Sequence, residues 1–185
     1  MIEIEYKGVR MNFNTLQTLF SPNALDLGTK AMLSCVHFSQ EDKVLDLGCG
    51  YGFVGIYAAK LIGESCVAMT DINAEAVFCA KENAIINNVP DINIIQSDGF
   101  KSIDETGYTI ILSNPPYHTD FSVAKHFIEK GFNRLAVGGR MLMVTKRRDW
   151  HKNKFIRIFG GVSIKEIDGY FIFIAEKRTL SYAKK

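Results

Sequence analysis

The chain has 185 residues, of which 47% are hydrophobic and 23% are charged, and its formal net charge is +2. This length and composition fit one compact globular domain. No apolar run approaches the roughly 18 residues that span a bilayer, and the N-terminus lacks the basic and apolar regions of a signal peptide, so we expect a cytoplasmic protein without a membrane partner. Because the net charge is small, any nucleic-acid contact must come from a local patch.

The four cysteines are too far apart to form a CxxC pair, and their spacing suits neither zinc nor a disulfide framework. We therefore expect free, buried or half-buried thiols and no metal. The cysteines are Cys35, Cys49, Cys66 and Cys79.

The first 40 residues predict an N-terminal extension. Apolar residues alternate over residues 1–14 around a turn at Lys7-Gly8, which is typical of a β-hairpin. A loop over residues 15–23 follows, and residues 26–38 are expected to be helical. We interpret residues 1–40 as a hairpin and a lid helix, and residues 41–185 as the core of the same single domain.

The remaining residues predict strands that alternate with helices, which is the pattern of an α/β, doubly wound, mostly parallel sheet. The last two strands are separated only by Asp168-Gly169 and indicate an antiparallel hairpin at one edge. Asn73 and Asp120 are expected to cap helices, and the helix after Asp120 carries an apolar stripe of Phe121, Ala124, Ile128, Phe132 and Leu135. The predicted strands cover residues 44–47, 65–70, 92–95, 108–113, 140–145, 162–167 and 170–176, and further helices cover 53–62, 73–88 and 149–159.

A glycine-rich loop follows the first core strand, and glycines there let the backbone approach a ligand. Residues 50–55 fit the dinucleotide fingerprint, with Asp71 at the distance expected for a ribose contact. Asp46 argues against a dinucleotide, because it would repel a pyrophosphate but attract a sulfonium ligand that carries an ammonium group. The candidate cofactor residues in this loop are Gly48, Cys49, Gly50 and Gly52.

Acidic residues follow three successive predicted strands, at the edge where open α/β sheets bind ligands. Asp71 is expected to accept both ribose hydroxyls, and Ile72 to cover one face of an adenine. Asp98, next to Gly99, is expected to accept a hydrogen bond from the adenine amino group. The alternative is that Asp46, Asp71 and Asp98 are helix caps or turn formers.

Asn114-Pro115-Pro116-Tyr117 follows the fourth core strand. The two prolines fix two φ angles and remove two N–H donors, which leaves a rigid shelf of carbonyl acceptors beside the Asn114 amide. Such a shelf suits a planar –NH₂ group, and Tyr117 is placed to stack on a flat base. The alternative is that the motif is only a proline-rich turn.

These motifs resemble those of the class I S-adenosylmethionine-dependent methyltransferases, and among them the small-domain family. That family includes bacterial ribosomal guanine-N2 methyltransferases and compact archaeal homologues. Residues 46–50 are similar to its cofactor loop and residues 114–117 to its catalytic motif. Phe20-Ser21 and the segment 25–29, which ends at Thr29, are similar to the region that covers the cofactor. His118 is similar to the residue after the motif in the ribosomal guanine enzymes, and the resemblance extends over about residues 18–176.

The resemblance implies a seven-stranded sheet in the order 3-2-1-4-5-7-6 and S-adenosylmethionine as cofactor. It implies methyl transfer to an exocyclic amino group of an RNA base, guanine in ribosomal RNA. A protein glutamine amide and the amino group of adenine in DNA or RNA are alternative targets. Two readings outside methyl transfer are an NAD-dependent oxidoreductase, which Asp46 disfavours, and a non-catalytic cofactor-binding subunit.

The densest basic stretch begins with Lys146-Arg147-Arg148 and continues with Lys152, Lys154 and Arg157. It is interpreted either as a rim that contacts RNA phosphates or as an ordinary solvated helix face. Phe20 and His118 are further candidates for contact with the substrate.

Overall fold

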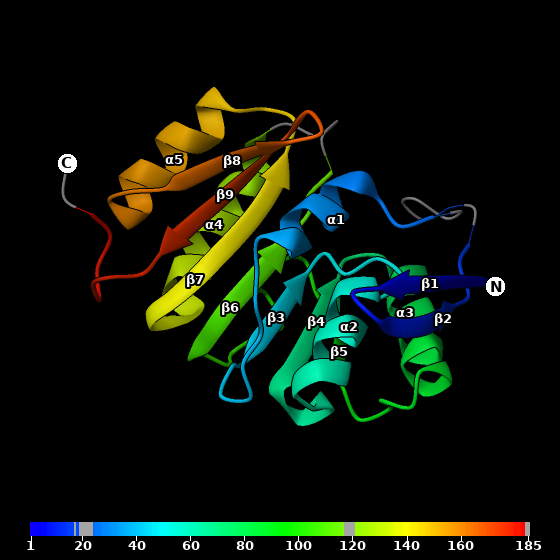
Figure 1. The fold of residues 1–185 in the computed structure, drawn as a ribbon. Coiled ribbons are helices and arrows are strands. Elements are labelled where there is room, and N and C mark those ends of the chain that lie inside the picture. Colours follow the sequence, from blue (N-terminus) through cyan, green and yellow to red (C-terminus); the bar gives the residue numbers. More distant parts are fainter. Residues whose placement is uncertain (17, 19–23, 117–120, 184–185) are drawn as a thin grey trace.

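The chain folds into a large sheet with helices on both faces and a small hairpin beside it (Figure 1). The computed structural model describes residues 1–16, 18, 24–116 and 121–183. The elements before the large sheet are β1 (Ile2–Tyr6), β2 (Val9–Phe13) and α1 (Leu27–Ser34). The others are β3 (Val44–Leu47), α2 (Phe53–Ile62), a 3₁₀ turn (Glu64–Cys66), β4 (Val67–Asp71), α3 (Ala74–Ile86), β5 (Asn93–Gln96), β6 (Tyr108–Ser113), α4 (Phe121–Arg134), β7 (Leu135–Thr145), α5 (Asp149–Phe159), β8 (Ser163–Ile167) and β9 (Tyr170–Glu176).

The large sheet has seven strands in the order β5-β4-β3-β6-β7-β9-β8. Its first five strands run parallel, whereas β9 is antiparallel to both β7 and β8. Asp168 and Gly169 both have positive φ, as a two-residue hairpin turn of type I′ requires. The predicted strand order and the edge hairpin are confirmed.

Two separate cores lie on the two faces of this sheet, because successive strand residues point to opposite sides. Val44 belongs to the core that includes residues of α1, α2 and α3, whereas its neighbour Leu45 belongs to the core that includes residues of α4 and α5. Both are fully buried, as expected of a central strand that is covered on both faces. The fold is therefore doubly wound, as predicted.

The hairpin of β1 and β2 is held by two buried asparagines, one within α3 and one at the carboxyl cap of this helix. Asn87 accepts the Asn12 N–H at 3.0 Å, and Asn83 accepts the Asn14 N–H at 2.8 Å. The Asn83 amide also donates to the Tyr51 carbonyl in the glycine loop at 2.8 Å. The hairpin thus packs on α2 and α3. Among the described residues of the expected lid, those that border the cavity at the carboxyl ends of the strands are Thr18, Leu25, Asp26, Thr29 and Met32.

Several predicted boundaries are wrong where the sequence carries no stop signal. The helix expected over 26–38 ends at Ser34, with no glycine or proline to mark its end. The strand expected over 140–145 begins five residues earlier, at Leu135. Gly138 and Gly139 are residues typical of a turn, but in this chain they lie within the strand. Leu135 therefore belongs to a strand rather than to the helix stripe.

Smaller corrections concern single residues. Asp71 is the last residue of β4 rather than the residue after it, and Phe121 is only half-buried. Asn73 caps α3 as predicted, since its side chain accepts the Glu75 N–H. The cap predicted at Asp120 lies outside the described residues.

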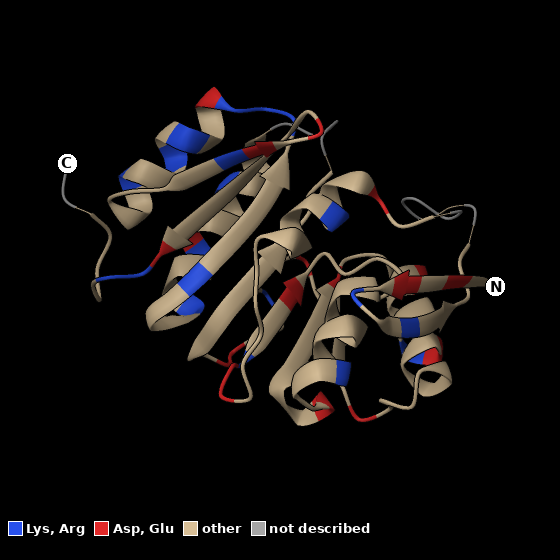
Figure 2. Cartoon of the chain, in the orientation of Figure 1, with Lys and Arg blue, Asp and Glu red and all other residues tan. Residues whose placement is uncertain are grey.

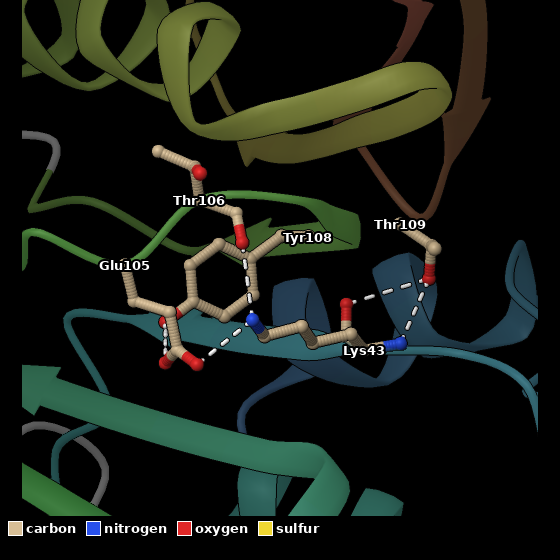
Figure 3. A network of polar contacts seen from close by, with 5 residues as sticks. All are labelled: Lys43, Glu105, Thr106, Tyr108 and Thr109. Carbon is tan, nitrogen blue, oxygen red and sulfur yellow. Dashed lines mark hydrogen bonds and ion pairs between the residues drawn. The ribbon is translucent and has the colours of Figure 1, made fainter.

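A polar network fixes the relative register of β3 and β6 at their amino ends (Figure 3). The Lys43 N–H donates to Thr109 Oγ1 at 3.0 Å, and the Lys43 ammonium lies 2.8 Å from Glu105. Leu47 consequently pairs with Ser113 at the other end of the two strands. This register places the glycine loop after Leu47 beside the motif that starts at Asn114.

The cysteines are free, with Cys49 and Cys79 buried and Cys35 and Cys66 half-buried, as predicted. Among the described residues, no helix is long and apolar enough to cross a membrane. The same residues contain no cluster of three His, Cys, Asp or Glu side chains suited to a metal ion.

Candidate active site

A cavity of about 420 Å³ lies at the carboxyl ends of β3, β4, β5 and β6. Small-molecule sites in proteins usually measure roughly 300–1,000 Å³. Residues far apart in the sequence meet here, because parallel strands end at the same edge of the sheet. The predicted site residues that line the cavity are Thr29, Asp46, Gly48, Cys49, Gly50, Asp71, Ile72, Asp98, Gly99, Asn114, Pro115 and Pro116.

The glycine loop is anchored on β4 by three backbone donors. The N–H groups of Gly48 and Cys49 both donate to the Thr70 carbonyl, at 2.8 and 2.9 Å. The Gly50 N–H donates to Asp71 Oδ2 at 2.9 Å. Gly48 and Gly50 have φ of 80° and 55°, which explains why the loop needs glycine at both positions.

Gly52 and Gly55 shape the helix behind the loop. Gly52 does not line the cavity, and a Cβ at this position would lie 3.2 Å from the Ala80 Cβ of α3. At Gly55 an added Cβ would lie 2.2 Å from Met69 Sδ in β4. These glycines let α2 pack closely on its neighbours, which is a structural role rather than a ligand contact.

Asp46 is a carboxyl group almost without solvent contact, with a relative exposure of 3%. Its Oδ2 accepts the Gly55 N–H in the first turn of α2 at 3.0 Å. Burial raises the pKa of Asp46 to about 7, the Gly55 N–H opposes this shift, and the nearby Asp71 adds to it. Asp46 thus accepts a hydrogen bond from one of the unpaired N–H groups at the start of α2, and it also lines the cavity.

Asp71 is half-buried, and both of its oxygens accept backbone hydrogen bonds. Oδ2 accepts from Gly50 and Oδ1 accepts from Asn73, each at 2.9 Å. A carboxylate oxygen has two acceptor sites, so each oxygen retains capacity for a ligand hydroxyl. Asp71 therefore shapes the loop whether or not a ligand is bound.

Asp98 and Ile72 border the cavity from its exposed side. Asp98 lies 2.5 Å from the Lys101 ammonium, and this bond lowers the pKa of Asp98. Ile72 lines the cavity and is 64% exposed, which leaves its surface available to a flat ligand.

Asn114 is held by two side chains from the start of α1. Its Nδ2 donates to Asp26 Oδ2 at 2.8 Å and to Thr29 Oγ1 at 3.0 Å. Pro115, which follows it, is buried. Asn114 extends directly from β6, so strand, proline and helix all restrict its side chain.

The predicted basic rim lies outside the cavity wall. Lys146, Arg147 and Arg148 are exposed and follow the carboxyl end of β7, the strand next to β6. Tyr117, His118 and Phe20, predicted to contact the substrate, lie outside the described residues.

A family model described as "Methyltransferase small domain" matches residues 10–174. The chain belongs to this family. This membership overturns the oxidoreductase reading of the glycine loop, as the charge of Asp46 suggested.

The curated proteins that are similar to this chain include proteins named as ribosomal RNA methyltransferases. The chain is 32% identical to "Ribosomal RNA small subunit methyltransferase C" of Psychromonas ingrahamii over 85% of its own length and 46% of that protein. It is 29% identical to the uncharacterized protein YbxB of Bacillus subtilis, over 89% and 85% of the two chains. It thus spans less than half of the ribosomal RNA methyltransferase, but most of YbxB.

A solved structure has the same fold as the present chain. The T. thermophilus 16S rRNA N2 G1207 methyltransferase, in complex with AdoMet and guanosine, superposes with a TM-score of 0.86. The identity is 24%, and the match covers 96% of this chain and 50% of the other.

Sequence reasoning missed Asp26 as a site residue. It noted the segment 25–29 only for its resemblance, although an Asp three residues before Thr29 is a recognisable helix N-cap. No sequence signal could show that the same carboxylate reaches Asn114, 88 positions away. Thr70 was missed as well, since its side chain reads as part of a buried strand but lines the cavity.

Proposed function

We propose that this chain transfers a methyl group from S-adenosylmethionine to an exocyclic amino group of an RNA base, guanine in ribosomal RNA. The observation that carries the proposal is the restrained Asn114 amide on the wall of a cavity that also contains Asp46 and Asp71. RNA is supported by relatives whose names describe ribosomal RNA methyltransferases.

The residues of the cavity fit this cofactor. No ion pair among the described residues includes the buried Asp46, so a cationic ligand would supply the missing partner. Thr70 also lines the cavity, and within the described part of the chain its Oγ1 is buried without a hydrogen-bond partner. Asp71 would accept the ribose hydroxyls, and Ile72, Asp98 and Gly99 would surround the adenine.

The catalytic edge suits a target amine. S-adenosylmethionine supplies, when bound, a methyl group that is activated by its sulfonium. An aromatic –NH₂ is a poor nucleophile, because its lone pair is delocalised into the ring. If the Asn114 side-chain oxygen and the Pro115 carbonyl each accept a hydrogen bond from one of its two N–H groups, the nitrogen becomes pyramidal. Its lone pair can then attack the methyl carbon. No base would be needed beforehand. As the N–C bond forms, the S–CH₃ bond would break and its electron pair would return to sulfur, while the proton on the nitrogen becomes acidic and would pass to water.

A basic rim beside this edge would hold the RNA backbone. Figure 2 shows Lys and Arg along α5 and in the segment before it. Lys146 lies 5.0 Å above the Tyr170 ring, and Arg147 lies 5.1 Å above the Phe121 ring, which stacks on Trp150 at 4.4 Å. These packing contacts orient the cations while they remain exposed, which favours a phosphate-binding surface over a freely solvated one.

Two measurements test the proposed function. Calorimetry should detect binding of S-adenosylmethionine and S-adenosylhomocysteine but not of NAD. Purified protein should also transfer tritiated methyl groups to ribosomal RNA from a strain in which the gene is deleted. Mass spectrometry of nucleosides from that strain should show the loss of one N2-methylated guanosine.

The alternative targets give different results in the same experiments. Loss of a methylated adenosine would identify adenine rather than guanine as the target base. Tritium label in protein instead of RNA would indicate a glutamine amide as the target. Binding of NAD without any response to S-adenosylhomocysteine would overturn the proposal as a whole.

A further inference from the structure

The start of α1 is joined to the catalytic motif through one carboxylate oxygen. Oδ2 of Asp26 accepts the Thr29 N–H at 2.7 Å, which makes Asp26 the N-cap of the helix. The same oxygen accepts from Asn114 Nδ2 at 2.8 Å. All three residues line the cavity.

An asparagine amide has two unlike ends, and exchanging them reverses donor and acceptor. An ionised carboxylate can only accept hydrogen bonds, so only the nitrogen end of the Asn114 amide can face Asp26. Thr29 Oγ1 accepts from that same nitrogen at 3.0 Å. When the amide nitrogen faces α1, the amide oxygen points away from α1. This oxygen is the acceptor that the proposed mechanism uses.

We propose that Asp26 is a positioning residue that selects the catalytically competent orientation of the Asn114 amide. This inference rests on the proposed function. Asp26 acts through Asn114, and it couples catalysis to the docking of α1, because one oxygen serves both the helix cap and the catalytic side chain. A helix that undocks from the sheet would release the amide.

Two substitutions separate the cap from the positioning role. Serine is a good N-cap, so Asp26→Ser keeps an acceptor for the Thr29 N–H while its shorter side chain no longer reaches Asn114. Asp26→Asn keeps both acceptor contacts through its amide oxygen. Loss of the groups that orient metal ligands typically costs about 10–100-fold in activity, and we take the same order of magnitude for a group that orients Asn114. We expect such a loss in single-turnover methyl transfer for Asp26→Ser, near-normal cofactor affinity, and substantial rescue in Asp26→Asn.

A double-mutant cycle shows whether the effect passes through Asn114. In an Asn114→Ala background, Asp26→Ser should cost less than about twofold, because the group that it positions is already absent. Equal losses in both backgrounds would mean that Asp26 acts only by stabilising α1, and this would overturn the inference.

A second measurement does not depend on the substrate. The Asn114 side-chain NH₂ signals can be identified in ¹H–¹⁵N spectra by their absence in Asn114→Ala. They should be shifted and slow to exchange with solvent in the wild type and Asp26→Asn, and should lose both properties in Asp26→Ser. Unchanged signals in Asp26→Ser would overturn the inference. If the wild type methylates no RNA, the proposed function fails, whereas the spectra still test the contact.

Discussion

The two walls of the cavity are held by different means. On the cofactor wall, the carboxylates of Asp46 and Asp71 accept backbone N–H groups of the loop and helix that follow β3. On the catalytic wall, the Asn114 amide donates to side chains from α1. The first wall is fixed by main-chain geometry and the second by contacts between side chains.

Because of this difference, mutations in the two walls should affect different properties of the enzyme. Damage to the cofactor wall disturbs the loop itself and should reduce ligand affinity. Damage to the catalytic wall leaves the backbone intact and should reduce turnover instead, because interactions that strengthen in the transition state affect rate more than ground-state binding.

The largest expected effect is at Asn114. Removing one pre-organised polar contact to the reacting group typically costs roughly 10²–10³ in rate. Asn114→Ala should fold, bind cofactor within a few-fold of the wild type and lose at least about a hundredfold in turnover. Single-turnover transfer of tritiated methyl groups to ribosomal RNA, with cofactor affinity measured in parallel, checks this. Asn114→Asp keeps an acceptor but loses the Nδ2 donor and places a second carboxylate against Asp26, so it should recover only part of the turnover that is lost in Asn114→Ala. Near-normal turnover in Asn114→Ala would reduce the motif to a turn.

Asp71 should show the opposite pattern. Asp71→Ala leaves the Gly50 and Asn73 N–H groups without their acceptor and removes the proposed ribose contact. Ribose hydroxyls that are buried without an acceptor cost about 1–3 kcal/mol, so cofactor affinity in calorimetry should fall by roughly 5–150-fold. Asp71→Asn, which keeps one acceptor oxygen, should lose less. If Asp71→Ala lowered turnover at saturating cofactor but left affinity unchanged, the division between the two walls would be wrong.

The basic rim belongs to neither wall and should affect only RNA. Neutralising Lys146, Arg147 and Arg148 together should weaken RNA binding for every sequence, by about tenfold at moderate salt, and reduce the salt slope by roughly one per lost phosphate contact. The control neutralises Lys7, Arg10 and Lys81, exposed cations on the hairpin and α3. Equal behaviour of the two triple variants would identify the rim as an ordinary solvated face.

The last expected effect is on stability rather than on function, and it is a change at Asp46 in the slope of stability against pH. Its pKa is about 7 in the folded protein and about 3.9 when unfolded, so between these values the native state holds a proton that the unfolded state has released. The free energy of unfolding should therefore fall as the pH rises from about 4 to about 7. Asp46→Asn still accepts the Gly55 N–H but does not titrate, so its denaturant unfolding should depend less on pH in this range. Identical slopes would show that Asp46 ionises normally.

Sequence patterns predicted the elements well where local chemistry marks both ends. The helix 149–159 and the strands 44–47 and 108–113 have the predicted bounds. The prediction was poorer at Gly138-Gly139, where the backbone of β7 approaches β6 so closely that a Cβ on Gly139 would lie 2.8 Å from the Tyr108 carbonyl. That glycine reflects a neighbour distant in the sequence, which a turn rule cannot register.

The sequence by itself determined the fold class, the strand order through its family resemblance, and the position of the cofactor loop. It did so because alternating apolar runs, glycines with positive φ and carboxylates at strand ends are local features whose place on a parallel sheet follows from chain order. Only the tertiary structure decided how Asp26 meets Asn114 and how Asn83 ties the hairpin to the glycine loop. These contacts join residues that no periodicity relates, because they depend on how α1 and α3 dock on the finished sheet.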